Sequence, residues 1–208
     1  MALFSTAYFP PVAYMAAFSR FADVRIEACE TYPKQTYRNR TIINTANGQL
    51  PLTVNVTKPN GNHTLTKDIT ICRKENWPMQ HWRAIVSAYN ASPYFLYYAD
   101  EVQKIIFGNH VFLLDLNMDI LQFLIKRLKI SATTETTTNF LPQESGTNDY
   151  RYVFSPKAKN KITLTPYQQV FDDRYGFVGD VGVLDLLFNL GPESRLYLDK
   201  VGIAFTNL

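Results

Sequence analysis

Hydrophobic and polar residues follow two different periods within the first 29 residues. Residues 2–9 form a short apolar run that ends at Pro10-Pro11, which predicts a buried strand. From Pro11 to Phe21 the apolar residues recur with a helical period, and residues 23–29 alternate as a strand again. A strand, a helix and a strand in this order favour a right-handed crossover between parallel strands. Ligands of such folds bind beyond the carboxyl ends of the strands.

Residues 41–56 predict an antiparallel hairpin. β-branched residues run into Asn47-Gly48, a turn signal because both central residues of a type I′ turn need positive φ. Leu52, Val54 and Val56 then alternate with polar residues, as in a half-buried strand. We therefore expect an α/β fold with a β-α-β opening, parallel strands, an appended antiparallel hairpin and several packed helices.

The rest of the chain contains further periodic stretches. Apolar spacing predicts helices from near Pro78, from Pro93 to Gly108, over residues 113–128 and over residues 181–188, the last with Asp180 as its N-cap. The remaining expectations are strands at 65–72, 150–154 and 196–205, a β-prone run at 131–138, a surface loop at 142–148 and a basic turn at 155–161.

Composition excludes several classes of protein. The chain has 208 residues, of which 46% are hydrophobic and 19% charged, as expected of one folded domain spanning residues 1–208. Its net charge of +3 and pI near 8.8 are too mild for a nucleic-acid binder.

With no apolar run of about 18 residues and no signal peptide, a cytoplasmic protein without a membrane span is expected. Two distant cysteines and three scattered histidines favour reduced thiols and no metal site, and nothing indicates a cofactor.

A cationic cluster precedes the hairpin and is the main candidate for chemistry. Lys34, Arg38 and Arg40 lie close together in sequence, and the forked donors of guanidinium groups match carboxylates and phosphates. The cluster therefore predicts a site for a small anionic ligand. A charged strand edge that deters aggregation is the alternative interpretation.

We expect the site to form where residues from several elements converge. Glu30 and His81 are the candidate catalytic bases, since either could accept a proton, although a histidine on an aromatic-rich helix is also typical of packing. Tyr32, Tyr37 and Trp82 could stack on a ligand or pack in the core. Asp185 is expected to face the anion site or solvent, and Arg38→Ala to abolish anion binding while leaving the melting temperature nearly unchanged. The predicted substrate-binding residues are Tyr8, Lys34, Tyr37, Arg38, Asn39, Arg40 and Trp82.

Motifs along nearly the whole chain carry a resemblance to a known family. They are Tyr8-x-Pro10 with Tyr14, Ala22-Asp23, Lys34 with Arg38-Asn39-Arg40, the run 52–56, Trp77 with His81-Trp82, Pro93-Tyr94-Phe95 and the run from Gly176 to Gly191. In order and spacing they resemble the bacterial WbqC-like family, which is associated with surface polysaccharide and O-antigen gene clusters. Members commonly begin with His-Gln-Pro-Asn-Tyr, whereas Phe4, Ser5, Thr6, Ala7 and Tyr8 stand here. The segment between Thr138 and Tyr167 also looks shorter than in typical members.

The resemblance implies a role in making or modifying activated sugars. It leads to the expectation of an enzyme of surface polysaccharide (O-antigen) biosynthesis, a transferase acting on a nucleotide-linked sugar or an acyl donor. The alternative is a non-catalytic binding or scaffold protein that has lost the family's N-terminal His-Gln pair.

Overall fold

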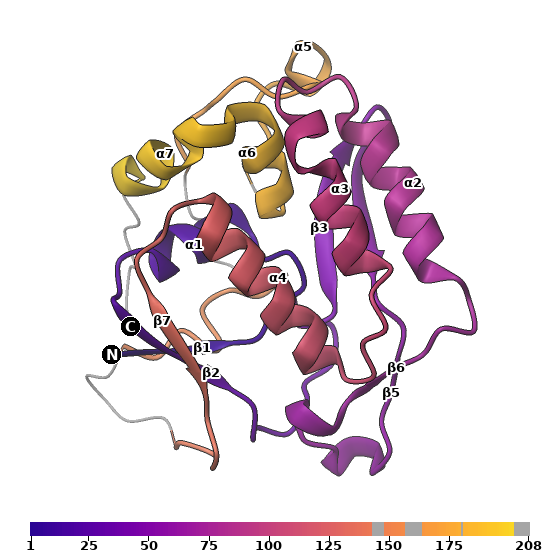
Figure 1. The fold of residues 1–208 in the computed structure, drawn as a ribbon, viewed down its shortest axis with the longest axis vertical. Helices are drawn as coiled ribbons and strands as arrows, with labels where there is room; N and C mark the ends of the chain where they lie inside the picture. Colours follow the sequence, from indigo (N-terminus) through magenta and orange to yellow (C-terminus); the bar gives the residue numbers. More distant parts are fainter. Residues whose placement is uncertain (143–147, 157–163, 180, 202–208) are drawn as a thin grey trace.

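Three parallel strands form the sheet on which the rest of the chain is arranged. The computed structural model describes residues 1–142, 148–156, 164–179 and 181–201 (Figure 1). The sheet has the order β1-β2-β7, from β1 (Ala2–Ser5), β2 (Asp23–Glu27) and β7 (Thr133–Thr136). Ser5 pairs with Glu27, and Ile26 with Thr136, so the three carboxyl ends lie at one edge. The predicted α/β fold with parallel strands is confirmed.

Helix α1 (Val12–Phe18) joins β1 to β2 and packs on the sheet through aromatic rings. Every one of its side chains is buried, and Pro11 precedes its first turn, where a missing N–H costs nothing. The ring of Phe4 on β1 lies 5.0 Å from the ring of Tyr14 and 5.5 Å from that of Phe18. Because β1 ends at Ser5, earlier than predicted, residues 6–11 form a connection above the carboxyl edge of the sheet.

The hairpin is present, with a different turn from the predicted one. Strands β3 (Arg40–Thr45) and β4 (Gly48–Thr53) pair antiparallel, with Thr45 opposite Gly48. The two loop residues are therefore Ala46 and Asn47. Only Gly48 has a positive φ, of 98°, so the prediction of a type I′ turn centred on Asn47-Gly48 is wrong.

Most predicted helices are confirmed, and they cover the hairpin and the core (Figure 1). Helices α2 (Trp77–Tyr89) and α3 (Phe95–Ile106) run beside the hairpin, and α6 (Val183–Leu190) meets both. The ring of Phe188 lies 5.3 Å from the ring of Tyr89 and 5.2 Å from that of Phe95. The other elements are α4 (Leu113–Arg127), β5 (Val56–Thr57), β6 (Thr70–Ile71), the short helices η1 (Gly61–His63) and η2 (Thr66–Asp68), α5 (Asp172–Tyr175), η3 (Gly191–Glu193) and α7 (Ser194–Lys200).

Three predicted strands are wrong in whole or in part. The predicted strand at 196–205 begins inside helix α7, where Leu198 is fully buried, and residues 202–205 lie outside the described residues. Residues 151–153 form a turn, because the Asp149 carboxylate accepts a hydrogen bond from the Arg151 backbone N–H. The predicted strand at 65–72 is reduced to β6, preceded by η2.

Some sequence-based predictions concern residues that the structure does not describe. Asp180, residues 143–147 of the predicted loop and residues 157–161 of the predicted basic turn are among them. Among the described residues, no helix is both long enough and apolar enough to cross a bilayer.

Candidate functional site

Polar residues gather where the three parallel strands end. Beyond β2 the chain continues through Glu27 to Glu30, and beyond β7 it continues through Thr137, which hydrogen-bonds to Glu27 over 2.7 Å. Both glutamates and Thr137 are buried. Parallel α/β sheets bind their ligands at this edge, which makes it the candidate site.

Glu30 and Arg38, which were expected to converge, form a buried ion pair. Nε and Nη2 of Arg38 lie 2.8 Å and 2.6 Å from the same oxygen, Oε1 of Glu30. Burial raises the pKa of Glu30, and the charge of Arg38 opposes that rise. Asn117 on α4 donates a hydrogen bond of 2.7 Å to the Arg38 carbonyl, which holds the arginine backbone in place.

This burial changes the expected effect of replacing Arg38. Its exposed fraction is 2%. Removing the guanidinium would leave Glu30 as a buried carboxylate without its partner, which is strongly unfavourable. An unchanged melting temperature for Arg38→Ala is therefore incompatible with the structure, and a different residue must be used to test anion binding.

One buried hydrogen-bond donor at this site, the O–H of Tyr32, has no partner. Nη2 of Arg38 has only its ion-pair contact of 2.6 Å to Glu30, which lies outside hydrogen-bond geometry. Burial raises the pKa of the Tyr32 phenol, and the charge of Arg38 opposes that rise. An unsatisfied buried polar group costs about 1–3 kcal/mol, and such groups need a specific explanation.

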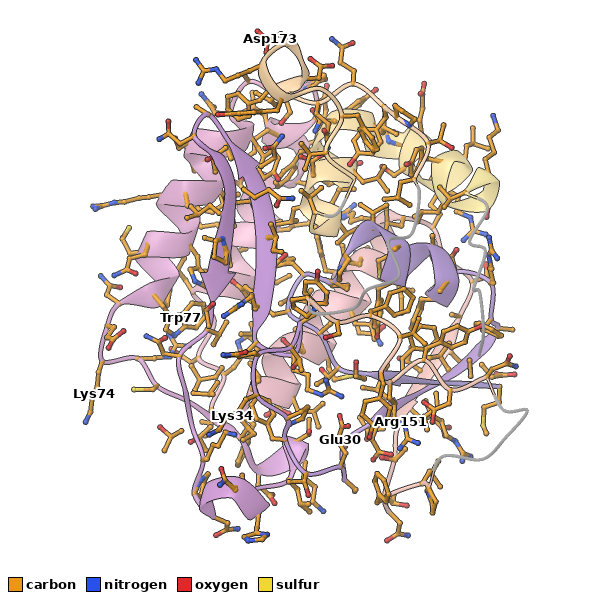
Figure 2. The ribbon with its side chains drawn as sticks, turned by 180° about the vertical axis from the view of Figure 1, so that it is seen from behind. Glu30, Lys34, Lys74, Trp77, Arg151 and Asp173 are labelled. Atoms are coloured by element: carbon orange, nitrogen blue, oxygen red, sulfur yellow. The ribbon has the colours of Figure 1, made fainter. Side chains whose placement is uncertain are left out.

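A lysine lies over Tyr32, and a second lysine acts on the first. Nζ of Lys58 lies 4.9 Å from the centre of the Tyr32 ring. Burial, and then the charge of Lys34, lower the pKa of Lys58. Lys34 itself is exposed, and it lies below the hairpin in the view of Figure 2. The amine of Lys58 therefore places positive charge beside the unpartnered Tyr32 phenol.

A second buried ion network lies next to Glu30, and the sequence analysis did not identify it. Arg151 donates from Nε and Nη2 to Asp149, and from Nη1 to Glu27 over 3.0 Å and to the Leu141 carbonyl over 2.6 Å. Figure 2 shows Arg151 beside Glu30. Its charge and that of Glu27 both act on Glu30, which makes the two ion networks one charged cluster. The sequence offers only the Asp149-x-Arg151 spacing as a signal, within a segment predicted to be a strand.

Tyr8 and His81 also meet, but as a buried pair. The Tyr8 hydroxyl lies 2.9 Å from Nδ1 of His81. Burial lowers the pKa of His81 to about 4. His81 is accordingly neutral at pH 7.

Four other predicted contact residues make contacts within the protein. The Asn39 amide donates to the Val54 carbonyl over 2.9 Å, and Nε of Arg40 to Thr53 over 3.3 Å, so both hold the hairpin. Tyr37 is buried, and its carbonyl accepts from the Tyr8 backbone N–H. The Trp82 ring is half-buried, 6.2 Å from the ring of Phe95. Together with the burial of Tyr32, these contacts favour packing over ligand stacking for the predicted aromatic residues.

Comparison with known proteins agrees with the motif pattern. The model of the WbqC-like protein family matches residues 6–155. The chain belongs to the WbqC-like family. The uncharacterized protein Rv1507c of Mycobacterium tuberculosis is 29% identical over 220 aligned positions, which cover 92% of this chain and 91% of that protein. No solved structure matches the chain.

The charged cluster lies within the part of the chain that the WbqC-like family model covers. Glu27, Glu30, Arg38, Asp149 and Arg151 all fall within residues 6–155. The match begins at residue 6. Among the described residues, no group of three His, Cys, Asp or Glu side chains could hold a metal ion.

Asp185 forms a separate buried polar cluster on α6, outside that matched range. Its Oδ1 accepts hydrogen bonds from the Tyr167 hydroxyl at 2.7 Å and from the Gln169 amide at 2.8 Å. Tyr89 faces the same carboxyl, but its O–H lies outside hydrogen-bond geometry. Asp185 is 1% exposed, and burial raises its pKa. The expectation that Asp185 faces the anion site or solvent is wrong, because α6 is buried on every side.

Proposed function

We propose that this protein binds the phosphates of an activated, nucleotide-linked sugar at the carboxyl edge of its parallel sheet. In this proposal it is an enzyme of surface polysaccharide biosynthesis. The observation that carries the proposal is the buried O–H of Tyr32, which has no partner, with the amine of Lys58 over the same ring. The charges of Arg38 and Lys34 add to it, acting on Tyr32 and on Lys58 respectively.

An anionic oxygen suits this arrangement better than a neutral group. Arginine nitrogens donate and cannot accept, so a ligand must supply the acceptor. A phosphate oxygen could accept from the phenol, and its negative charge would be attracted to the guanidinium of Arg38. Charge-assisted hydrogen bonds are also about twice as strong as neutral ones. The lysines would then steer the anion and contact its outer oxygens.

Glu30 is the group we propose as the base in a transfer reaction. Its pKa is raised by burial, and bases act best when their pKa is near the working pH. In the proposed step Glu30 takes the proton of an acceptor hydroxyl while that oxygen forms a bond to the sugar carbon. The bond from this carbon to the leaving diphosphate breaks, and Arg38, Tyr32 and Lys34 stabilise the charge of the diphosphate. His81 would position Tyr8.

Tyr32→Phe tests the anion site without breaking a protein contact. Because the phenol has no partner, we expect the melting temperature of the free protein to stay equal or rise slightly. Nucleotide diphosphate sugars and pyrophosphate should stabilise the unaltered protein in a thermal-shift titration, whereas free monosaccharides should not. In Tyr32→Phe the affinity for these phosphates should fall about 10-fold or more, the scale of one hydrogen bond to a charged group.

The matched control is Tyr89→Phe, which also removes a buried phenol oxygen, in the Asp185 cluster. It should leave phosphate affinity unchanged. If neither pyrophosphate, nor nucleotide sugars, nor acyl-coenzyme A shifts the melting temperature of the unaltered protein, the anion site is refuted and the non-catalytic scaffold becomes the better interpretation.

Lys34→Gln is expected to weaken phosphate binding by a smaller amount that depends on salt. An exposed charge contributes about 0.2–1 kcal/mol, or up to about fivefold in affinity. The loss should shrink as ionic strength rises, because salt screens exposed charges. Calorimetric titration with pyrophosphate at two salt concentrations measures it. Lys74→Gln removes an exposed lysine that lies at the edge of the molecule in Figure 2, on the side of Lys34 away from Glu30, and it should change nothing. Equal losses of affinity in both variants would mean that surface lysines attract phosphate without a specific site.

A further inference from the structure

Two aromatic rings lie over the guanidinium of Arg151 and remain half exposed. The centres of the Phe140 and Tyr152 rings are 5.3 Å and 5.6 Å from the central guanidinium carbon. Their exposed fractions are 49% and 53%, although Arg151 itself is 1% exposed. The rings therefore cover a buried cation on one side and face solvent on the other.

Arg151 is unsuited to binding the ligand's anion itself. Each of its side-chain nitrogens already donates to Asp149, Glu27 or the Leu141 carbonyl. What its charge still offers is cation–π attraction, which holds the two rings in place. The arginine thus fixes the position of an aromatic surface at the edge of the charged cluster.

This aromatic surface belongs to the same charged cluster as Glu30 and Arg38. The Tyr152 ring lies over Arg151, which donates to Glu27 at 3.0 Å, and the charges of Glu30 and Arg38 both act on the Tyr152 phenol. Single exposed aromatic residues are common and need no explanation. Two rings held on one buried guanidinium, within the charged cluster, form a more specific arrangement, since flat ligand rings bind to aromatic faces.

We infer that Phe140 and Tyr152 stack with the nucleobase of a nucleoside diphosphate whose phosphates occupy the site of Tyr32 and Arg38. This inference rests on the proposed function and adds the class of ligand to it. It also moves the stacking role from Tyr32, Tyr37 and Trp82, which pack within the protein, to two residues that the sequence analysis did not single out.

The test compares ligands that share phosphates but differ in their rings. Calorimetric titration would use pyrophosphate, the diphosphates of uridine, cytidine, thymidine, guanosine and adenosine, and glucose 1-phosphate, which has a sugar ring and no base. At least one nucleoside diphosphate should bind about 10- to 100-fold more tightly than pyrophosphate, the gain expected from stacking one base.

Variants identify the rings responsible. Phe140→Leu and Tyr152→Leu should each remove much of the nucleotide's advantage while leaving pyrophosphate affinity within about twofold, a difference too small to represent a lost hydrogen bond. Tyr152→Phe, which keeps the ring, should bind nucleotides like the unaltered protein. Tyr97→Leu, which removes an exposed aromatic ring from α3, is the matched control and should have no effect. If Tyr152→Leu fails to fold, Phe140→Leu makes the same test at the other ring.

The outcomes separate this inference from the proposed function. If pyrophosphate binds through Tyr32 but no nucleoside diphosphate binds more tightly, the base-stacking inference is overturned and the anion site stands. Equal losses of pyrophosphate and nucleotide affinity in the Phe140 and Tyr152 variants would also overturn it. So would a result in which these aromatic rings increase the affinity for glucose 1-phosphate alone. If none of the phosphates binds, both proposals fail.

Discussion

Replacing Arg151 by methionine is expected to lower the free energy of unfolding by about 3–5 kcal/mol, the cost of breaking a buried ion pair from one side. Methionine keeps much of the side-chain volume but leaves Glu27 and Asp149 buried without their cation. Both carboxylates are within 3.0 Å of the guanidinium nitrogens in the unaltered protein. Urea unfolding followed by circular dichroism measures the loss.

Two controls separate the charge effect from a general loss of packing. Arg195→Met breaks an exposed pair with Asp199, one helical turn away, and should cost no more than about 0.5 kcal/mol. The double variant Arg151→Met with Asp149→Asn should recover part of the loss, because one of the uncompensated charges is then removed. A loss below about 1 kcal/mol for Arg151→Met would contradict a structural role for the network.

Asp185→Asn is expected to stabilise the protein at neutral pH. The carboxyl of Asp185 is buried, its hydrogen-bond partners are neutral groups, and burial raises its pKa. An amide oxygen can still accept from Tyr167 and Gln169 without carrying a buried charge. The gain should be about 1–2 kcal/mol, since replacing a poorly compensated buried charge by a neutral group is often stabilising. This corresponds to about 2–8 °C in melting temperature for a chain of this size.

The pH dependence of stability tests the stabilisation by Asp185→Asn independently. A carboxyl whose pKa is raised on folding binds its proton more tightly in the folded state. Its contribution to stability is fully present below the unfolded pKa of about 3.9 and is lost as pH rises through the higher folded pKa. Asp185→Asn should therefore match the unaltered protein near pH 3.5 and exceed it increasingly at higher pH. Melting curves across this range measure the difference.

Asp173→Asn is the matched control, because Asp173 is exposed on α5 at the far end of the molecule from Glu30 and Arg151 (Figure 2). It should follow the pH dependence of the unaltered protein. If Asp185→Asn loses as much stability between pH 4 and pH 7 as the unaltered protein does, the Asp185 carboxyl is not the source of the pH dependence.

The two buried networks share a physical consequence for the site. Glu27, Asp149 and Arg151 hold the ends of β2 and the segment after β7 in one arrangement, and Glu30 with Arg38 extends that arrangement towards Tyr32. Buried ion pairs contribute little to stability when compared with apolar packing. Their presence at the carboxyl edge of the sheet is consistent with groups held in position for a ligand.

Much of the fold could be predicted from local sequence because local pattern and final structure agree. The change from an apolar run to a helical period and back to alternation predicted β1, α1 and β2, and apolar spacing predicted α2, α3 and α4. These patterns work because one face of each element must be buried. The pairing of Glu30 with Arg38 was also accessible, since both residues lie within one short connection between β2 and β3.

The remaining features depended on contacts between distant parts of the chain. Glu27 and Arg151 are 124 positions apart, and no periodic signal links them. Residues 150–154 have the composition of a strand, yet the Asp149–Arg151 interaction holds a turn there. Asp185 lies in an apolar helix that could have exposed one side, and only the packing of α2, α3 and α6 around it shows that the carboxyl is buried. Sequence alone determined which side chains could carry charge, whereas tertiary burial decided which of them have partners, because desolvation depends on the neighbours that folding brings together.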